Sequence, residues 1–269
     1  MELHLNGHIA VVTGGASGIG RAAAEAFAAE GAEVALWDFA PNVMDVAGEI
    51  AAGGSGRVIG LTVDVSDEQS VLDALCETEQ QLGPVRHLVH AAAMGSGKFG
   101  FPFLNLEPND WRRVLDVNVM GMVHVAHAVA PGMIERKAGT MVFVASVAGQ
   151  IGSPTDPPYS ASKAANINFA QCMAKDLAAY GVRVNSLCPG MVKTPLNKSV
   201  WQSWHDRQPP ESRQSYEEWA EEKLRSIVPL GQWQEPADIA NMAVFLSSER
   251  AAQVTGQTVN VDGGYVIHW

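Results

Sequence analysis

Apolar runs rich in β-branched residues recur at seven places along the chain. Several are apolar at every position instead of alternating with polar residues, which is typical of parallel strands that crossover helices bury on both faces. The runs predict strands at Ile9–Thr13, Glu33–Trp37, Val58–Val63, Val85–His90, Thr140–Ala145, Val182–Leu187 and Thr258–Val261. We therefore expect a seven-stranded parallel sheet.

Segments of helical length separate the predicted strands. Arg21–Glu30 is rich in alanine and is followed by Gly31, which favours a helix that ends at this glycine. Ser66 and Gln69 have the spacing of a capping box ahead of a second helix over Val71–Leu82.

This alternation of strand and helix predicts a single doubly wound α/β domain of the Rossmann type over residues 1–269, with helices on both faces of the sheet. The exception is Met191–Gln234, where Trp201, Trp204 and Trp219 stand among charged residues. A long insertion of this kind is typical of a substrate lid or binding loop.

Composition and charge limit the classes of partner that the chain can bind. The net charge of −11 at pH 7 and the pI near 5.1 disfavour nucleic acid and anionic membranes, because both need clustered Lys and Arg. No apolar run reaches the roughly 18 residues of a membrane-spanning helix, and Met1–Val12 lacks a secretory signal pattern. The cysteines, Cys76, Cys172 and Cys188, show no metal-ligand spacing and suit reduced thiols. We expect a cytoplasmic protein without a metal site.

Four glycines, Gly14, Gly15, Gly18 and Gly20, lie between the first predicted strand and the first predicted helix. Glycine allows backbone angles that are closed to other residues, and it lets backbone N–H groups and the positive helix end approach an anion. A glycine cluster alone also suits an ordinary tight turn. Its place directly after the first strand favours a pyrophosphate site and hence a dinucleotide cofactor.

Asp38 ends the second strand about twenty residues after the glycines, where a carboxylate can accept hydrogen bonds from both ribose hydroxyls of an adenosine. A 2′-phosphate would be repelled there, and neither Ser17 nor Phe39 supplies a positive charge to hold one. The pattern favours NAD over NADP, although a solvated strand end also explains Asp38. Asp64, at the end of the third strand, could bind the adenine amino group or cap the next turn.

Ser146 follows the fifth predicted strand, and Tyr159 and Lys163 lie beyond it at the start of a helical segment. Because Tyr159 and Lys163 are four residues apart, they share one helix face. The ammonium and the nicotinamide charge would favour the phenolate of a tyrosine whose ordinary pKa is about 10. Tyr159 would then move the hydroxyl proton during hydride transfer while Ser146 binds the substrate oxygen. Each residue alone suits a surface or turn role, but together they predict an alcohol–carbonyl site.

With these motifs the sequence resembles the short-chain dehydrogenase/reductase family over nearly its whole length. The resemblance implies a fourth catalytic residue, Asn118, that holds a water for proton relay with the lysine. It implies that the Pro189-Gly190 turn flanks the nicotinamide, with Val192 and Thr194 at the carboxamide. It also matches Val261–Gly264 to the closing segment of the family.

The expected cofactor contacts combine these motifs with the neighbouring strand ends. They are Gly14, Ser17, Gly18, Ile19, Gly20, Asp38, Phe39, Asp64, Val65, Ala91, Ala92, Tyr159, Lys163, Pro189, Gly190, Val192 and Thr194.

One segment departs from the family pattern, which has Asn-Asn-Ala-Gly where this chain has His90–Ala93. Ala91 in place of the second Asn loses a hydrogen bond of about 1 kcal/mol. Ala93 in place of Gly restricts the backbone dihedral angles that this position can adopt. His90 is expected to be hydrogen-bonded within the fold, with a catalytic role as the alternative. His124 and His127 are read as helix-face residues, because no partner completes a metal site.

The substrate is expected to contact Ser146, Tyr159, Lys98, Gln150 and Trp201. Tryptophan beside hydrogen-bonding groups suits a sugar or polyol, whereas Lys98 or Arg207 could pair with an acid group. The tryptophans of the insertion could equally pack the lid down.

The leading interpretation is an NAD-dependent oxidoreductase that interconverts a secondary alcohol and a ketone of a polar small molecule, such as a sugar, polyol or hydroxy acid. The alternative enzyme is a 3-oxoacyl reductase for a carrier-bound or CoA-bound substrate, and the non-enzymatic alternative is a nucleotide-binding sensor or scaffold. The resemblance also implies a homotetramer or homodimer.

Overall fold

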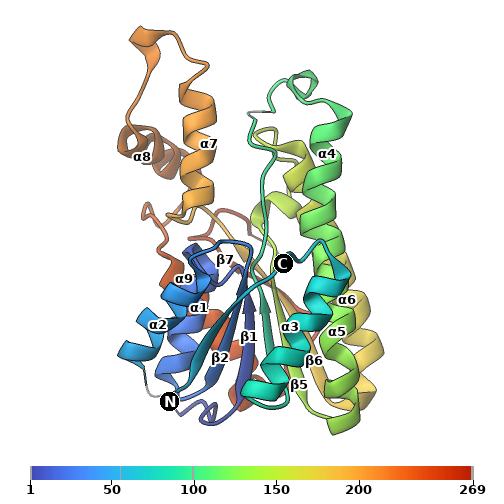
Figure 1. Cartoon of the computed structure of the whole chain (residues 1–269). Helices are drawn as coiled ribbons and strands as arrows, with labels where there is room; N and C mark the ends of the chain where they lie inside the picture. The colour runs from blue at the N-terminus through green and yellow to red at the C-terminus, as the bar shows by residue number, and fades with distance from the viewer. Residues whose placement is uncertain (1, 55, 99, 268–269) are drawn as a thin grey trace.

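The computed structural model describes residues 2–54, 56–98 and 100–267. They form a parallel sheet between two layers of helices (Figure 1). The strands are β1 (Ile9–Thr13), β2 (Glu33–Asp38), β3 (Val58–Thr62), β4 (His87–His90), β5 (Gly139–Val144), β6 (Val182–Pro189) and β7 (Thr258–Val261). The predicted Rossmann-type sheet is confirmed, and each predicted strand lies within two residues of its observed ends.

The sheet has the strand order β3-β2-β1-β4-β5-β6-β7. The chain therefore starts near the centre, builds outward to β3, and returns beside β1 to build the other half. Ile9 of β1 lies opposite Glu33 of β2, and Ala10 of β1 lies opposite His87 of β4. The direction of winding reverses between β1 and β4, and open α/β sheets bind ligands beyond the carboxyl ends of the strands at such a point.

Two helical layers cover the sheet. One face carries α1 (Gly18–Ala29), α2 (Val43–Gly53) and α9 (Pro236–Ser247). The other carries α3 (Glu68–Gln81), α5 (Gly121–Arg136) and α6 (Pro157–Leu177) (Figure 1).

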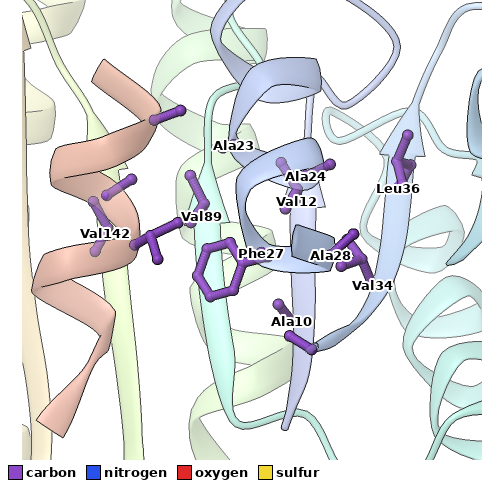
Figure 2. Close-up of a cluster of buried hydrophobic side chains, with 14 of the residues drawn as sticks. Ala10, Val12, Ala23, Ala24, Phe27, Ala28, Val34, Leu36, Val89 and Val142 are labelled. Atoms are coloured by element: carbon purple, nitrogen blue, oxygen red, sulfur yellow. The ribbon is translucent and has the colours of Figure 1, made fainter. Parts of the chain in front are cut away.

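Phe27 on α1 is wholly buried in the cluster beneath the first layer (Figure 2). It shares this cluster with Val12 of β1 and Val89 of β4, while the small Ala24 and Ala28 let the helix approach the sheet. Burying a phenylalanine stabilises the fold by about 1.5–3 kcal/mol, so this ring contributes to fixing α1, and with it the glycine loop, on the sheet.

Helix α3 begins differently from the prediction. Asp67 is its N-cap and accepts a hydrogen bond from Gln69 N at 3.1 Å. Ser66 instead donates its hydroxyl to Asp64 Oδ1 at 2.6 Å, and its backbone N–H donates to the same oxygen at 2.9 Å. The predicted Ser66 capping box is wrong, because Asp67 and not Ser66 is the N-cap of the helix. The prediction that Asp64 could cap the turn after β3 is confirmed.

A continuous helical run joins α4 (Pro108–Leu115) to α5 through a π-helical turn at Asp116–Met120. By length and composition alone, Pro108–Arg136 could cross a membrane, with a mean hydropathy of 1.4 in its most apolar window. The buried side of α5, including Met122 and Val129, belongs to the core beneath the second helical layer. A core helix passes the same test of length and hydropathy.

The insertion after β6 forms α7 (Pro195–His205) and α8 (Tyr216–Ile227), which stand above the sheet (Figure 1). They enclose a small apolar core of their own, built around Trp219 and Leu224. At its base, Gln234 Nε2 donates to the carbonyl oxygen of Val261 at 2.6 Å, so the end of the insertion is tied to β7.

Candidate active site

The carboxyl ends of the strands open into a cleft of about 760 Å³. Helices α7 and α8 contribute one wall, and α4 with the loop after β4 contributes the other (Figure 1). This volume is typical of a small-molecule or cofactor site. Every residue predicted to contact the cofactor lines the cleft: Gly14, Ser17, Gly18, Ile19, Gly20, Asp38, Phe39, Asp64, Val65, Ala91, Ala92, Tyr159, Lys163, Pro189, Gly190, Val192 and Thr194.

The glycine loop fits a diphosphate. A Cβ on Gly20 would overlap the carbonyl oxygen of Gly14, and Gly14 has a φ of +67°, which favours glycine. Ser17 is the N-cap of α1 but makes no side-chain hydrogen bond to it. The first N–H groups of α1 therefore stay available to an anion in the cleft.

The Asp38 carboxylate is fixed by two backbone donors at the end of β2. Ala16 N donates to Oδ2 and Ala40 N donates to Oδ1, each at 2.9 Å. Arg21, the basic residue closest in sequence to the glycine loop, is paired with two glutamates of its own layer at 2.9 and 3.0 Å. This end of the cleft thus holds a fixed negative charge, which suits ribose hydroxyls better than a phosphate.

Ser146, Tyr159 and Lys163 line the same cleft, because the first turns of α6 lie beside the end of β5. Lys163 Nζ donates to the carbonyl oxygen of Val144 at 2.7 Å and lies 5.5 Å from the centroid of the Tyr159 ring. Ser146 Oγ accepts a hydrogen bond from Ala148 N at 3.1 Å, which orients the serine at the strand end. The structure brings the three predicted residues together.

The pKa values at this cluster differ from the expectation. Burial raises the pKa of Tyr159 to about 12, although the Ser146 hydroxyl opposes this rise and the Asp156 carboxylate adds to it. Burial also lowers the pKa of Lys163 to about 8. The nearby Lys163 ammonium therefore does not lower the Tyr159 pKa by itself, because loss of water disfavours both charged forms and outweighs it. The phenol is a proton donor at neutral pH.

Asn118 lies in the π-helical turn and is buried. Its side-chain Oδ1 accepts from Met94 N at 2.8 Å, and its Nδ2 donates to Met94 O and to Ser162 Oγ, both at 2.9 Å. Its carbonyl oxygen accepts from Asn166 Nδ2 at 2.8 Å. Both hydrogens of the side-chain amide are used, so a water shared with Lys163 would have to donate to one of the two oxygens of Asn118.

The departure at His90–Ala93 is accommodated by Thr13. Its hydroxyl is 2.9 Å from His90 Nδ1 and accepts from Ala92 N at 3.1 Å, so His90 is hydrogen-bonded inside the fold as expected. Ala91 packs against the core beneath α1 in place of the missing amide. Ala93 is not among the positive-φ residues in the described part of the chain, so its backbone needs no glycine.

Two predicted substrate contacts, Gln150 and Trp201, are not among the residues that line the cleft, and both side chains are engaged elsewhere. The Gln150 amide exchanges two hydrogen bonds with Asn260, at 2.7 and 3.0 Å, which ties the loop after β5 to β7. Trp201 Nε1 donates to Gln214 O at 3.2 Å, and its ring contacts Tyr216. Trp201 therefore packs within the insertion, in line with the alternative that the sequence left open.

Lys98, another predicted substrate contact, does line the cleft but is already paired. Its ammonium lies 2.8 Å from Asp110 Oδ2, and this pairing raises the pKa of Lys98.

The buried Asp156 carboxylate caps α6 and accepts from Ser96 N at 2.8 Å, which joins the loop after β4 to helix α6.

Sequence reasoning missed Trp219, Lys223 and Ile227, which line the cleft from α8. Their spacing of four residues places them on one helix face and is the only signal that the sequence offered.

His124 is held within the fold, with Nδ1 3.0 Å from the carbonyl oxygen of Val65. Across the described residues no group of three or more His, Cys, Asp and Glu side chains could hold a metal ion.

A family model described as enoyl-(acyl carrier protein) reductase matches residues 14–266. The chain is 33% identical over 265 residues to a 3-oxoacyl-[acyl-carrier-protein] reductase of Thermotoga maritima, covering 98% of this chain and 100% of that protein. It is 35% identical over 265 residues to 2-(S)-hydroxypropyl-CoM dehydrogenase 3 of Xanthobacter autotrophicus, covering 98% of each.

Among solved structures, the fold is similar to L-sorbose reductase from Gluconobacter frateurii complexed with NADPH and L-sorbose. The TM-score is 0.90 and the identity is 28%, with all of both chains covered.

Proposed function

The chain belongs to the short-chain dehydrogenase/reductase family of oxidoreductases, and on that premise we propose that it interconverts a secondary alcohol and a ketone of a polar small molecule with NAD. The observation that carries the proposal is the position of Ser146, Tyr159 and Lys163 in the same cleft as the open glycine loop. The insertion over residues 191–234 would serve as the lid over the substrate.

The side chains of this cluster divide the work by their chemistry. Ser146 Oγ binds the substrate oxygen, and Tyr159 donates its proton to that oxygen during reduction or takes it during oxidation. Lys163, anchored on Val144 O, keeps a positive charge beside the phenol. A nicotinamide held beside these residues and the Pro189-Gly190 turn would supply or accept the hydride. Because the pKa of Tyr159 is about 12, we expect oxidation to need a higher pH than reduction.

Asp38 supports NAD as the cofactor, because its fixed carboxylate would lie close to a 2′-phosphate. At about 4 Å and an intermediate dielectric, two unit charges repel by on the order of 1–4 kcal/mol. The L-sorbose reductase structure contains NADPH, so the choice needs a direct measurement in this protein. In fluorescence titrations NADH should bind at least about tenfold more tightly than NADPH. Replacing Asp38 with Ser should reduce the difference in affinity between NADH and NADPH. Equal affinities in the unmodified protein would refute the preference for NAD.

Turnover is tested with sugars, polyols, hydroxy acids and their ketones, each with both cofactors. Tyr159→Phe should lower kcat by at least about 100-fold while leaving NADH affinity unchanged. If the variant keeps its activity, Tyr159 does not transfer the proton. If no substrate is turned over while NADH still binds, the nucleotide-binding sensor is the better interpretation.

A 3-oxoacyl reductase is the second candidate, favoured by the full-length similarity to the Thermotoga maritima enzyme. The same panel therefore includes 3-oxoacyl thioesters. Turnover of a thioester in preference to every free small molecule would select this candidate.

We also propose that the protein assembles as a homotetramer through its second helical layer. Ala161 and Ala164 are exposed on α6, and small residues allow two helices to approach closely. Light scattering after size-exclusion chromatography tests this, with Ala164→Arg expected to reduce the oligomer size.

A further inference from the structure

Helix α8 turns one face toward the substrate end of the cleft. Trp219, Lys223 and Ile227 follow one another at successive turns of this helix, and all three line the cleft. Capping of α8 by Ser215, whose Oγ accepts from Glu218 N at 3.2 Å, fixes the start of the helix. The face is apolar except for one cation in its middle.

The Lys223 ammonium has no counter-charge. It lies 4.4 Å from the centroid of the Trp219 ring, and within the described residues no carboxylate comes within 4.0 Å of it. Partial burial lowers the pKa of Lys223. A ring face attracts a cation but does not neutralise it, and a cation removed from water without a partner is costly. The Lys223 ammonium can therefore form an ion pair with an anion that enters the cleft.

The other cations of the cleft are already engaged or solvated. Lys98 is paired with Asp110, and Lys163 donates to Val144 O beside Tyr159. Arg113 lines the opposite wall but is exposed to solvent. Lys223 is therefore the partly buried cation that an incoming substrate can pair with.

We propose that Lys223 binds a carboxylate of the substrate, so that the substrates are hydroxy acids and oxo acids rather than neutral sugars. This rests on the proposed function, because it assumes that the alcohol or ketone carbon lies at Tyr159. A carboxylate on Lys223 would leave the hydrocarbon part of the substrate against Trp219 and Ile227. A neutral polyol would leave the ammonium unpaired and bring hydroxyls against those two apolar side chains.

The test uses straight-chain methyl ketones that carry a terminal carboxylate, in a series of increasing chain length, each beside its methyl ester. An ester keeps the shape but removes the charge. The acid of the fitting length should have a kcat/KM at least about tenfold above that of its ester, mostly through KM. Lys223→Met should remove this preference by weakening the acid alone, and Lys223→Arg should retain most of it.

Lys193 provides the matched control. Its ammonium lies 5.5 Å from the centroid of the Trp233 ring in the same insertion, yet Lys193 is outside the cleft lining. Lys193→Met should leave both acid and ester kinetics unchanged. The proposal is overturned if Lys223→Met weakens acid and ester equally, or if neutral polyols exceed every acid in the unmodified protein.

Calorimetric binding of the same oxo acids separates this inference from the proposed function. If the protein turns over none of the panel, the oxidoreductase assignment fails, but Lys223 is still tested by whether the oxo acids bind and whether Lys223→Met abolishes that binding. Turnover of neutral ketones without any carboxylate preference would keep the assignment and refute the role of Lys223.

Discussion

His90 makes the fold sensitive to acid, and the size of the effect follows from its burial. It is 3% exposed, its Nδ1 is committed to Thr13, and its Nε2 has no partner among the described residues. Burial, helped by the charge of Lys163, lowers the pKa of His90 to about 3. In the unfolded chain the ordinary value of about 6.5 returns.

The sign follows from proton binding. Between about pH 6.5 and about pH 3 the unfolded chain carries a proton on His90 that the folded chain lacks, so stability falls as the pH falls. The slope is about 1.4 kcal/mol per pH unit for one histidine, and from about pH 7 to about pH 5 the loss is about 2 kcal/mol.

Replacing His90 with Asn, the residue usual in the family at this position, removes this contribution. Urea unfolding, followed by tryptophan fluorescence at one protein concentration, should show the unmodified protein losing about 2 kcal/mol more than the variant between about pH 7 and about pH 5. The acid sensitivity of the buried His87, whose pKa burial also lowers, is present in both proteins and cancels. His127→Asn controls for removal of an exposed histidine. Equal losses in the unmodified protein and in His90→Asn would refute the reasoning.

Three further predictions test the framework of the cleft. Gly20→Ala should abolish NADH binding in a fluorescence titration, because the added Cβ would overlap the carbonyl oxygen of Gly14; retained affinity would show that the loop can rearrange. Trp37→Phe should lower the free energy of unfolding by about 1–3 kcal/mol in urea, because it leaves the buried Thr78 hydroxyl without the indole N–H that it accepts at 3.0 Å. Gln234→Ala should free the base of the insertion and speed limited proteolysis there at least severalfold, and unchanged cleavage rates would mean that the insertion core holds itself in place.

The sheet and the cofactor end of the cleft could be predicted because each depends on local sequence. A strand buried on both faces has to be apolar throughout, and the glycines, Asp38 and the Tyr159–Lys163 pair owe their positions to strand ends and helix periodicity. The cap of α3 shows the limit of such reasoning, since Ser66 and Asp67 are both good N-cap residues. Asp67 is the N-cap because the Ser66 hydroxyl donates its hydrogen bond to the Asp64 carboxylate instead.

The substrate end could not be predicted because it depends on contacts between distant segments. Gln150 pairs with Asn260, which lies 110 residues further along the chain, and no local pattern announces this contact. The rise in the Tyr159 pKa has the same origin, because the burial that causes it depends on how the folded chain packs around the ring.

The two ends of the cleft are held in place by different parts of the fold. The side chains of the proposed catalytic groups are held by hydrogen bonds to backbone groups, Lys163 to Val144 O at the end of β5 and Asn118 to Met94 N in the loop after β4. The cleft wall formed by α8 belongs to a separate apolar core around Trp219, which the polar contacts of Gln234 join to the sheet. We therefore expect substitutions within that wall to change the substrate preference more than they change proton transfer. Under the proposed function, we therefore expect substrate choice to depend on the cleft-facing residues of α8, and proton transfer to depend on the residues at the end of β5 and on α6.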